Sequence, residues 1–90
     1  MNDLSARQWH IDTPGAGVLY PFNFKCAHIQ YAGYSTQGNQ AVITDKNGKI
    51  VCTLLGAADL EEVRSSKIGW VNGLIVPTLQ GNGFVTIYTE

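Results

Sequence analysis

The residues of this chain that are able to do chemistry are two histidines, two cysteines and a short acidic cluster. His28 lies two residues after Cys26, so both side chains share one face if this segment is an extended strand. A zinc site can be drawn from this pair together with Cys52 or His10. Structural zinc sites, however, use tighter paired spacings than these. We therefore expect an ordinary strand histidine, with no metal site and no other cofactor.

The two cysteines leave two alternatives open. Cys26 and Cys52 fall in adjacent predicted strands, and the interpretation favoured here is a pair of buried small thiols. The other alternative is a disulfide, which requires an oxidising compartment, and the first ten residues lack the layout of a secretory signal. Neither cysteine has the charged neighbours that produce a reactive thiolate.

Catalysis requires a nucleophile with a base and an orienting group, or a pair of tuned carboxylates. Asp59, Glu61 and Glu62 are three carboxylates within four residues, on a predicted surface connection. Such a run is typical of a solvated face. The two Gly-x-Gly pairs lack the longer phosphate-binding fingerprint, and the chain has no Walker loop, nucleophile elbow or HExxH motif. The sequence thus predicts a non-enzymatic protein.

Aromatic residues are the candidates for binding, because Trp and Tyr are enriched in contacts and stack on sugars. We interpret Trp70 and Phe84 as core residues. Trp9 differs because it lies in a segment with no clear fold of its own, which predicts an anchor. This anchor either folds back onto the domain or docks on a neighbouring chain. The candidate partner-binding residues of this segment are Trp9, His10, Leu19 and Tyr20.

The composition predicts an all-β fold to position these residues. Val, Ile and Thr occur seven times each, and such stiff side chains favour a pleated sheet over a helix. We expect a small β-sandwich or barrel of about six short antiparallel strands. The firm strands are predicted at 23–31, 39–45, 49–55, 67–71, 74–79 and 84–89, with weaker ones at 8–12 and 18–20.

Glycine and proline mark the predicted connections. Asn47-Gly48 predicts a two-residue type I′ hairpin, since both residues tolerate positive φ. Asn72-Gly73 and Gly81-Asn82-Gly83 are expected to form turns as well. Pro77 lacks a backbone donor, which places its strand at an edge or a bulge. Residues 56–66 form either one helical turn or an extended crossover, and the sequence does not separate the two.

The chain of 90 residues has room for one domain. We expect an extended N-terminal arm at 1–22 and a β-sandwich domain at 23–90, because the early Pro-Gly-Ala-Gly run cannot hold a helix. A core this small gains stability by association, so a homo-oligomer is expected. A net charge of −1 with 14% charged residues weighs against nucleic acid and anionic membranes as partners. No apolar run reaches the roughly 20 residues of a membrane span.

The C-terminal half supplies one resemblance. The stretch from Trp70 to Leu79, WVNGLIVPTL, and the closing strand from Gly83 to Tyr88 resemble small β-rich accessory proteins of tailed bacteriophages. The likeness covers roughly residues 24–88. It implies a non-enzymatic structural component of the virion, assembled in the host cytoplasm. Exposure of such a particle outside the cell favours the disulfide alternative.

The resemblance implies two placements. In the first, the protein is a capsid decoration or cement protein that clamps neighbouring major capsid subunits through its N-terminal arm. In the second, it is a tail or fibre component that presents loops to a host receptor. The loop contact candidates for this second role are Tyr34, Gln37, Asn39 and Asn82.

Overall fold

The computed structural model describes residues 2–5 and 8–90, and these form seven strands without a helix. This confirms the all-β prediction. Every pairing between the strands is antiparallel. The strands are β1 (Gln8–Ile11), β2 (Tyr20–Ala32), β3 (Gln40–Thr44), β4 (Ile50–Leu55), β5 (Val63–Arg64), β6 (Gly69–Leu79) and β7 (Phe84–Thr89).

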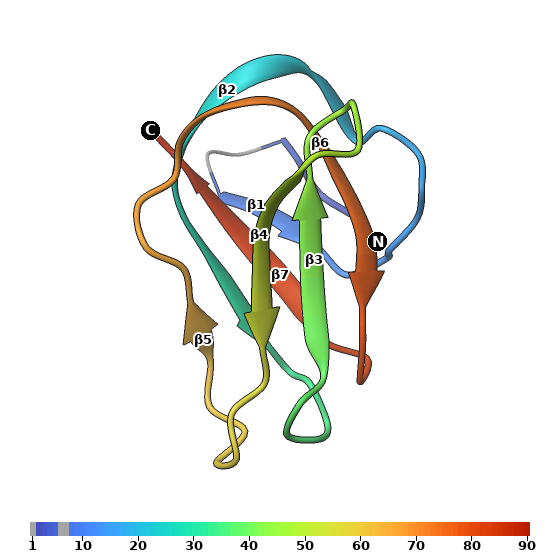
Figure 1. Cartoon of the computed structure of the whole chain (residues 1–90), viewed down its shortest axis with the longest axis vertical. Coiled ribbons are helices and arrows are strands. Elements are labelled where there is room, and N and C mark those ends of the chain that lie inside the picture. Colours follow the sequence, from blue (N-terminus) through green and yellow to red (C-terminus); the bar gives the residue numbers. More distant parts are fainter. Residues whose placement is uncertain (1, 6–7) are drawn as a thin grey trace.

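The seven strands make one continuous sheet that folds over onto itself. Its order is β1-β7-β2-β6-β3-β4, and β5 pairs with β2 outside this path. Strand β2 is 13 residues long and pairs with β6 through its first half and with β7 through its second half. Strand β6 likewise pairs with β2 first and with β3 afterwards. These two long strands carry the chain around, so that β3 and β4 lie in front of β7 and β1 (Figure 1).

The core lies between these two layers. Alternate residues of each strand point inward, as the two-residue period of a strand requires. In β7, for example, Val85 and Ile87 are fully buried, and Phe84, Thr86 and Tyr88 on either side of them are half-buried. The buried hydrophobic residues are Trp9, Ile11, Phe24, Cys26, Ile29, Tyr31, Tyr34, Ala41, Ile43, Leu54, Val71, Leu74, Val76, Val85 and Ile87.

Strand β1 corrects the picture of the N-terminal segment as a separate arm. Trp9 pairs with Ile87 of β7, and the Trp9 side chain is only 6% exposed. Of the two roles left open for Trp9, the structure thus shows the one in which it folds back onto the domain. No break falls at residue 22 either, because β2 already begins at Tyr20 and the Leu19 amide donates to the Leu74 carbonyl at 2.8 Å.

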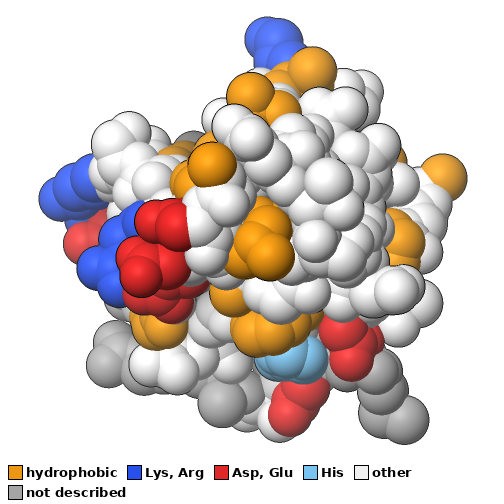
Figure 2. Space-filling model, turned by 90° about the horizontal axis from the view of Figure 1, so that it is seen from below, with side chains coloured by type: hydrophobic (Ala, Val, Ile, Leu, Met, Phe, Trp, Pro, Cys, Tyr) orange, Lys and Arg blue, Asp and Glu red, His pale blue; other side chains and the backbone are white. Residues whose placement is uncertain are grey.

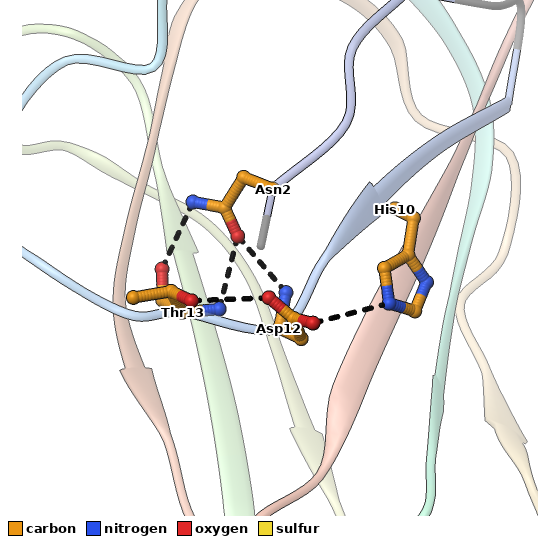
Figure 3. A network of polar contacts seen from close by, with 4 residues as sticks. All are labelled: Asn2, His10, Asp12 and Thr13. Atoms are coloured by element: carbon orange, nitrogen blue, oxygen red, sulfur yellow. Dashed lines mark hydrogen bonds and ion pairs between the residues drawn. The ribbon is translucent and has the colours of Figure 1, made fainter.

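Polar contacts fix the described part of the chain ahead of β1 (Figure 3). The amide oxygen of Asn2 accepts from the backbone N–H groups of Asp12 and Thr13 at 3.0 and 2.9 Å. The Asn2 amide nitrogen donates to the Thr13 carbonyl at 3.1 Å. Asp3 and His10 form an isolated antiparallel bridge that covers the outer edge of β1. This edge of the sheet is therefore shielded by the chain itself.

The hairpin between β3 and β4 forms as predicted, but its turn is of a different type. Only Gly48 has positive φ, at 84°, whereas a type I′ turn needs Asn47 there as well. The Gly48 N–H donates to the Asp45 carbonyl, and the Asp45 carboxylate accepts from the N–H groups of Asn47 and Lys49. The aspartate side chain therefore organises a longer loop that closes on a single left-handed glycine.

The structure also tests the predictions made for Asn72-Gly73, for residues 56–66 and for Pro77. The expected turn at Asn72-Gly73 is wrong, since both residues lie inside β6, which runs unbroken from Gly69 to Leu79. Residues 56–66 take the extended alternative, with a turn at Ala57–Leu60 followed by the short β5. Pro77 is exposed where the register between β3 and β6 shifts, as expected for a bulged strand.

Candidate functional site

The most exposed large hydrophobic side chain in the described structure is Trp70, at 72%. The expectation that Trp70 is a core residue is therefore wrong. In β6 the inward positions belong to its neighbour Val71 and then to Gly73 and Leu74, which turns Trp70 to the outside. An indole placed in water leaves a large apolar surface unburied, so this position is a candidate for binding.

Two asparagines and a lysine surround this indole. In the ladder between β2 and β6, Lys25 lies opposite Trp70 and Asn23 lies opposite Asn72. All four side chains are on the outer face and exposed. An open depression of about 320 Å³ lies here, lined by Asn23, Trp70, Val71 and Asn72. Within the described chain neither asparagine amide forms a side-chain hydrogen bond, so both remain available to a ligand.

A second open depression also includes Asn72. It measures about 450 Å³ and is lined by Asn72 and by the β3–β4 loop residues Asp45, Asn47, Gly48 and Lys49. The backbone N–H of Lys46 donates to the Asn72 carbonyl at 3.0 Å, which holds the loop against β6. The two depressions thus share one residue and form a continuous surface, here called the Trp70 surface: Asn23, Lys25, Trp70, Val71, Asn72, Asp45, Asn47, Gly48 and Lys49.

The second notable feature is the free edge of β4. Within the described residues β4 pairs with β3 alone. Ile50 and Leu55, at its two ends, are 67% and 59% exposed. The strand reads IVCTLL and carries no charge and no proline, which are the usual means of blocking an edge. Such an edge is suited to pairing with a strand of another chain.

Two residues expected in exposed contact loops have structural roles instead. Tyr34 is only 4% exposed, and its ring stacks on that of Tyr31 at 4.8 Å. Its hydroxyl accepts from the Ala57 N–H at 2.9 Å and donates to the Glu61 carbonyl. Asn39 is half-buried, and its side-chain oxygen accepts from the Thr36 N–H. The expectation of an exposed Tyr34 is therefore wrong.

The other two loop candidates are exposed. Gln37 lies in the 35–38 turn, and Asn82 has positive φ at the tip of the 80–83 turn. These loops approach one another, since a Cβ added at Gly81 would lie 2.8 Å from the Ser35 nitrogen. Figure 2 views the molecule from below: Lys and Arg side chains lie beside Asp and Glu at one margin, and hydrophobic side chains form separate spots. This face shows no large area of one charge or of apolar character.

The remaining candidates of the N-terminal segment are held within the molecule. The His10 imidazole lies 3.6 Å from the Asp12 carboxylate and 5.0 Å from the Phe84 ring. Leu19 and Tyr20 are half-buried and pack against the core, and the Tyr20 ring lies 4.7 Å from that of Trp9. Trp9, Leu19 and Tyr20 therefore belong to the core and its margin, whereas His10 lies on the surface beside Asp12 and Phe84.

The cysteines and His28 do not combine into a chemical centre. Cys26 and Cys52 are both free thiols, so the disulfide alternative is not formed in this structure. The His28 ring stacks on Tyr88 at 4.4 Å. No group of three His, Cys, Asp or Glu side chains in residues 2–5 and 8–90 is placed to hold a metal ion. Nor is any helix in that part of the chain long and apolar enough to cross a membrane.

Burial raises the pKa of the Cys26 thiol to about 12 from its ordinary 9.0, and proximity to Cys52 and Glu90 acts in the same direction. Since the folded pKa lies above the unfolded one, the neutral thiol favours folding below pH 9, and this contribution declines between pH 9 and 12. We expect stability to fall by about 2 kcal/mol between pH 9 and 10.5 on account of this group.

Urea unfolding of the reduced protein at pH 8, 9 and 10.5 measures this effect. The control is Cys26→Ala, which keeps the Tyr31 and Cys52 groups whose pKa values burial also raises. The variant is expected to lose about 2 kcal/mol less than the native chain over this range. If the free energy of unfolding of the two proteins changed in parallel with pH, the Cys26 thiol would not be buried in the way that the structure indicates.

Comparison with known proteins returns no relative: no family model, no curated protein and no solved structure matches this chain. The Trp70 surface and the β4 edge are therefore the features from which a function can be proposed for this chain.

Sequence reasoning missed the Trp70 surface, although one signal for it was present. Asn72 follows Trp70 by two residues and so shares its face of the strand, and a polar partner marks the solvent side. On the neighbouring strand the same alternation separates Asn23 and Lys25 from the buried Phe24. The two outer faces become one surface only when β2 and β6 pair, and that register is not readable from either strand alone.

Proposed function

We propose that this protein is a non-enzymatic structural subunit of a virus particle, a decoration or cement protein that stabilises the shell by binding neighbouring capsid subunits. The free β4 edge is the observation that carries the proposal. It supplies unpaired backbone groups and two exposed apolar side chains to a neighbouring chain. The resemblance of residues 24–88 to phage accessory proteins supports the same role.

The edge replaces the N-terminal arm as the means of attachment. The sequence predicts an arm that grips a neighbouring subunit, but β1 is paired with β7 and shielded on its outer side. Strand β4 is the other end of the sheet. Within the described residues no strand hydrogen-bonds to its outer side, although β5 approaches β4 there without pairing (Figure 1). A strand donated by a capsid subunit, or by a second copy of this chain, would continue the sheet there.

The ladder identifies which groups of β4 face outward. The Gly56 N–H donates to the Asn39 carbonyl at 2.7 Å, and the Gln40 N–H donates to Gln80 on the opposite side of β3. Because hydrogen-bonded and free positions alternate along an antiparallel strand, the N–H of Thr53 points away from β3. A proline at this position removes an outward donor and leaves the β3–β4 ladder in place.

Thr53→Pro is accordingly expected to abolish attachment while the domain stays folded. The measurement is the copy number of this chain in purified particles, by quantitative mass spectrometry against the major shell protein. The native chain and the control Thr53→Ala should be present at a ratio near one or at a simple large fraction. Thr53→Pro should be reduced at least tenfold. Equal incorporation of both variants, or absence of the native chain from particles, would refute the proposal.

A second candidate is a tail or fibre component that contacts a host receptor. The observation that favours it is the exposed indole of Trp70 beside two unengaged amides, since a shell-binding role does not require a polar recognition surface. A handful of copies per particle in the same experiment would assign the protein to the tail.

A further inference from the structure

We propose that the Trp70 surface is a carbohydrate-binding site, with Trp70 as the stacking platform and Asn23 and Asn72 as the groups that read hydroxyls. This inference goes beyond the structural role proposed above and does not depend on it. It rests on the isolated domain, where the indole, the two amides and both depressions are all present.

The arrangement of the four outer side chains matches the size of a sugar ring. Residues directly opposite in the ladder have Cβ atoms about 5 Å apart, and alternate residues of one strand are about 7 Å apart. Trp70 and Lys25 occupy one rung, and Asn72 and Asn23 the other. A pyranose ring that lies on the indole therefore places its edge hydroxyls above the two amides.

The chemistry of these groups also fits a sugar. The C–H face of a pyranose is apolar and packs on an exposed aromatic face, while its hydroxyls each donate and accept. An asparagine amide offers two donors and one acceptor oxygen, which suits a pair of adjacent hydroxyls. Neither Asn23 nor Asn72 uses its amide in the described chain, so ligand binding breaks no internal hydrogen bond.

The charges favour a neutral sugar over a phosphate-bearing ligand. Lys25 lies 3.9 Å from the Glu90 carboxylate, which offsets its charge. In the second depression, Lys49 is accompanied by Asp45. A nucleic acid base also stacks on tryptophan, but its backbone requires a stripe of unpaired cations, and this surface does not provide one.

The second depression indicates more than one sugar ring. It shares Asn72 with the first and is otherwise lined by Asp45, Asn47, Gly48 and Lys49. A ring over Trp70 and a linked ring over the β3–β4 loop would both contact Asn72. We therefore expect oligosaccharides to bind more tightly than the corresponding monosaccharide.

Titration of the ¹⁵N-labelled full chain with cellohexaose, maltohexaose and chitohexaose, each to 10 mM, tests the site by NMR. At least one should shift the indole N–H of Trp70 and the side-chain amides of Asn23 and Asn72. The indole N–H of the buried Trp9 provides an internal reference and should not move. Glucose or N-acetylglucosamine alone should bind at least tenfold more weakly than the hexamer.

Variants separate this site from general surface stickiness. Trp70→Ala is expected to remove binding, and Asn72→Ala to weaken it at least tenfold, with thermal unfolding of both close to that of the native chain. Phe22→Ala is the matched control and should bind as the native chain does, because Phe22 is likewise exposed, at 67%, but does not line either depression. Absence of shifts with all three sugars, or binding that survives Trp70→Ala, would overturn the inference. Incorporation into particles is measured separately, so either proposal can fail alone.

Discussion

Replacing Trp9 by alanine should lower the free energy of unfolding by about 3–5 kcal/mol, whereas replacing Trp70 should change it by less than about 1 kcal/mol. Trp9 is 6% exposed, and its ring lies 4.7 Å from Tyr20 and 4.8 Å from Phe24. Its removal leaves a cavity between β1 and the first half of β2. Trp70 is 72% exposed, so its removal leaves no cavity.

Urea unfolding of the native chain, Trp9→Ala and Trp70→Ala in parallel provides the measurement. Each variant retains one tryptophan, so circular dichroism, which does not depend on either indole, should follow the transition. Trp9→Phe serves as a graded control and should lose less than Trp9→Ala because part of the ring volume remains. If the two alanine variants were equally stable, Trp9 would not be a core residue and residues 8–11 would not be held in the sheet.

The two tryptophans show what could not be predicted from the sequence. Strand periodicity places Trp70 and Val71 on opposite faces, but it does not say which face is buried. Trp9 lies in a strand of only four residues, too short for a periodic signal, and its burial depends on pairing with β7 about 78 positions later in the chain. Both assignments follow from tertiary register. The sequence wrongly predicts a buried Trp70, and it leaves two alternatives open for Trp9.

The positions of the strands could be predicted from the sequence more fully than the burial of the two tryptophans. The segments from 39 to 55 and from 84 to 89 are rich in β-branched residues, and the structure places β3, β4 and β7 there. The turn predicted at Asn72-Gly73 is wrong because this pair, which is typical of turns, lies within strand β6. Its glycine is required by a close approach to another segment, and no local pattern reveals such a contact.

That close approach predicts the second large effect, the loss of stability in Gly73→Ala. Gly73 has φ of 84°, and a Cβ added there would lie 2.7 Å from the Cβ of Lys46 and 3.1 Å from the Tyr20 carbonyl oxygen. The positive φ costs an alanine about 1 kcal/mol. The overlap of the added methyl group with the Lys46 side chain and the Tyr20 carbonyl oxygen costs about 1–3 kcal/mol more. We expect a total loss of about 2–4 kcal/mol by urea unfolding.

Gly48→Ala is the matched control. Gly48 has the same φ of 84°, yet a Cβ added there meets nothing within 4 Å. It should lose only the conformational part, about 1 kcal/mol. The difference between the two variants therefore measures how firmly the β3–β4 loop is held against β6. This contact has a consequence for binding, because the Lys46 N–H bonds the Asn72 carbonyl and so brings the loop beside Asn72.

If Gly73→Ala costs no more than Gly48→Ala, the loop yields to the added methyl group, and the two depressions are not held in one fixed arrangement. If it costs the larger amount, the glycine is the residue that allows the loop and β6 to meet. In that case Asn72 is positioned by the fold to serve both depressions, and the Trp70 surface is formed before any ligand binds.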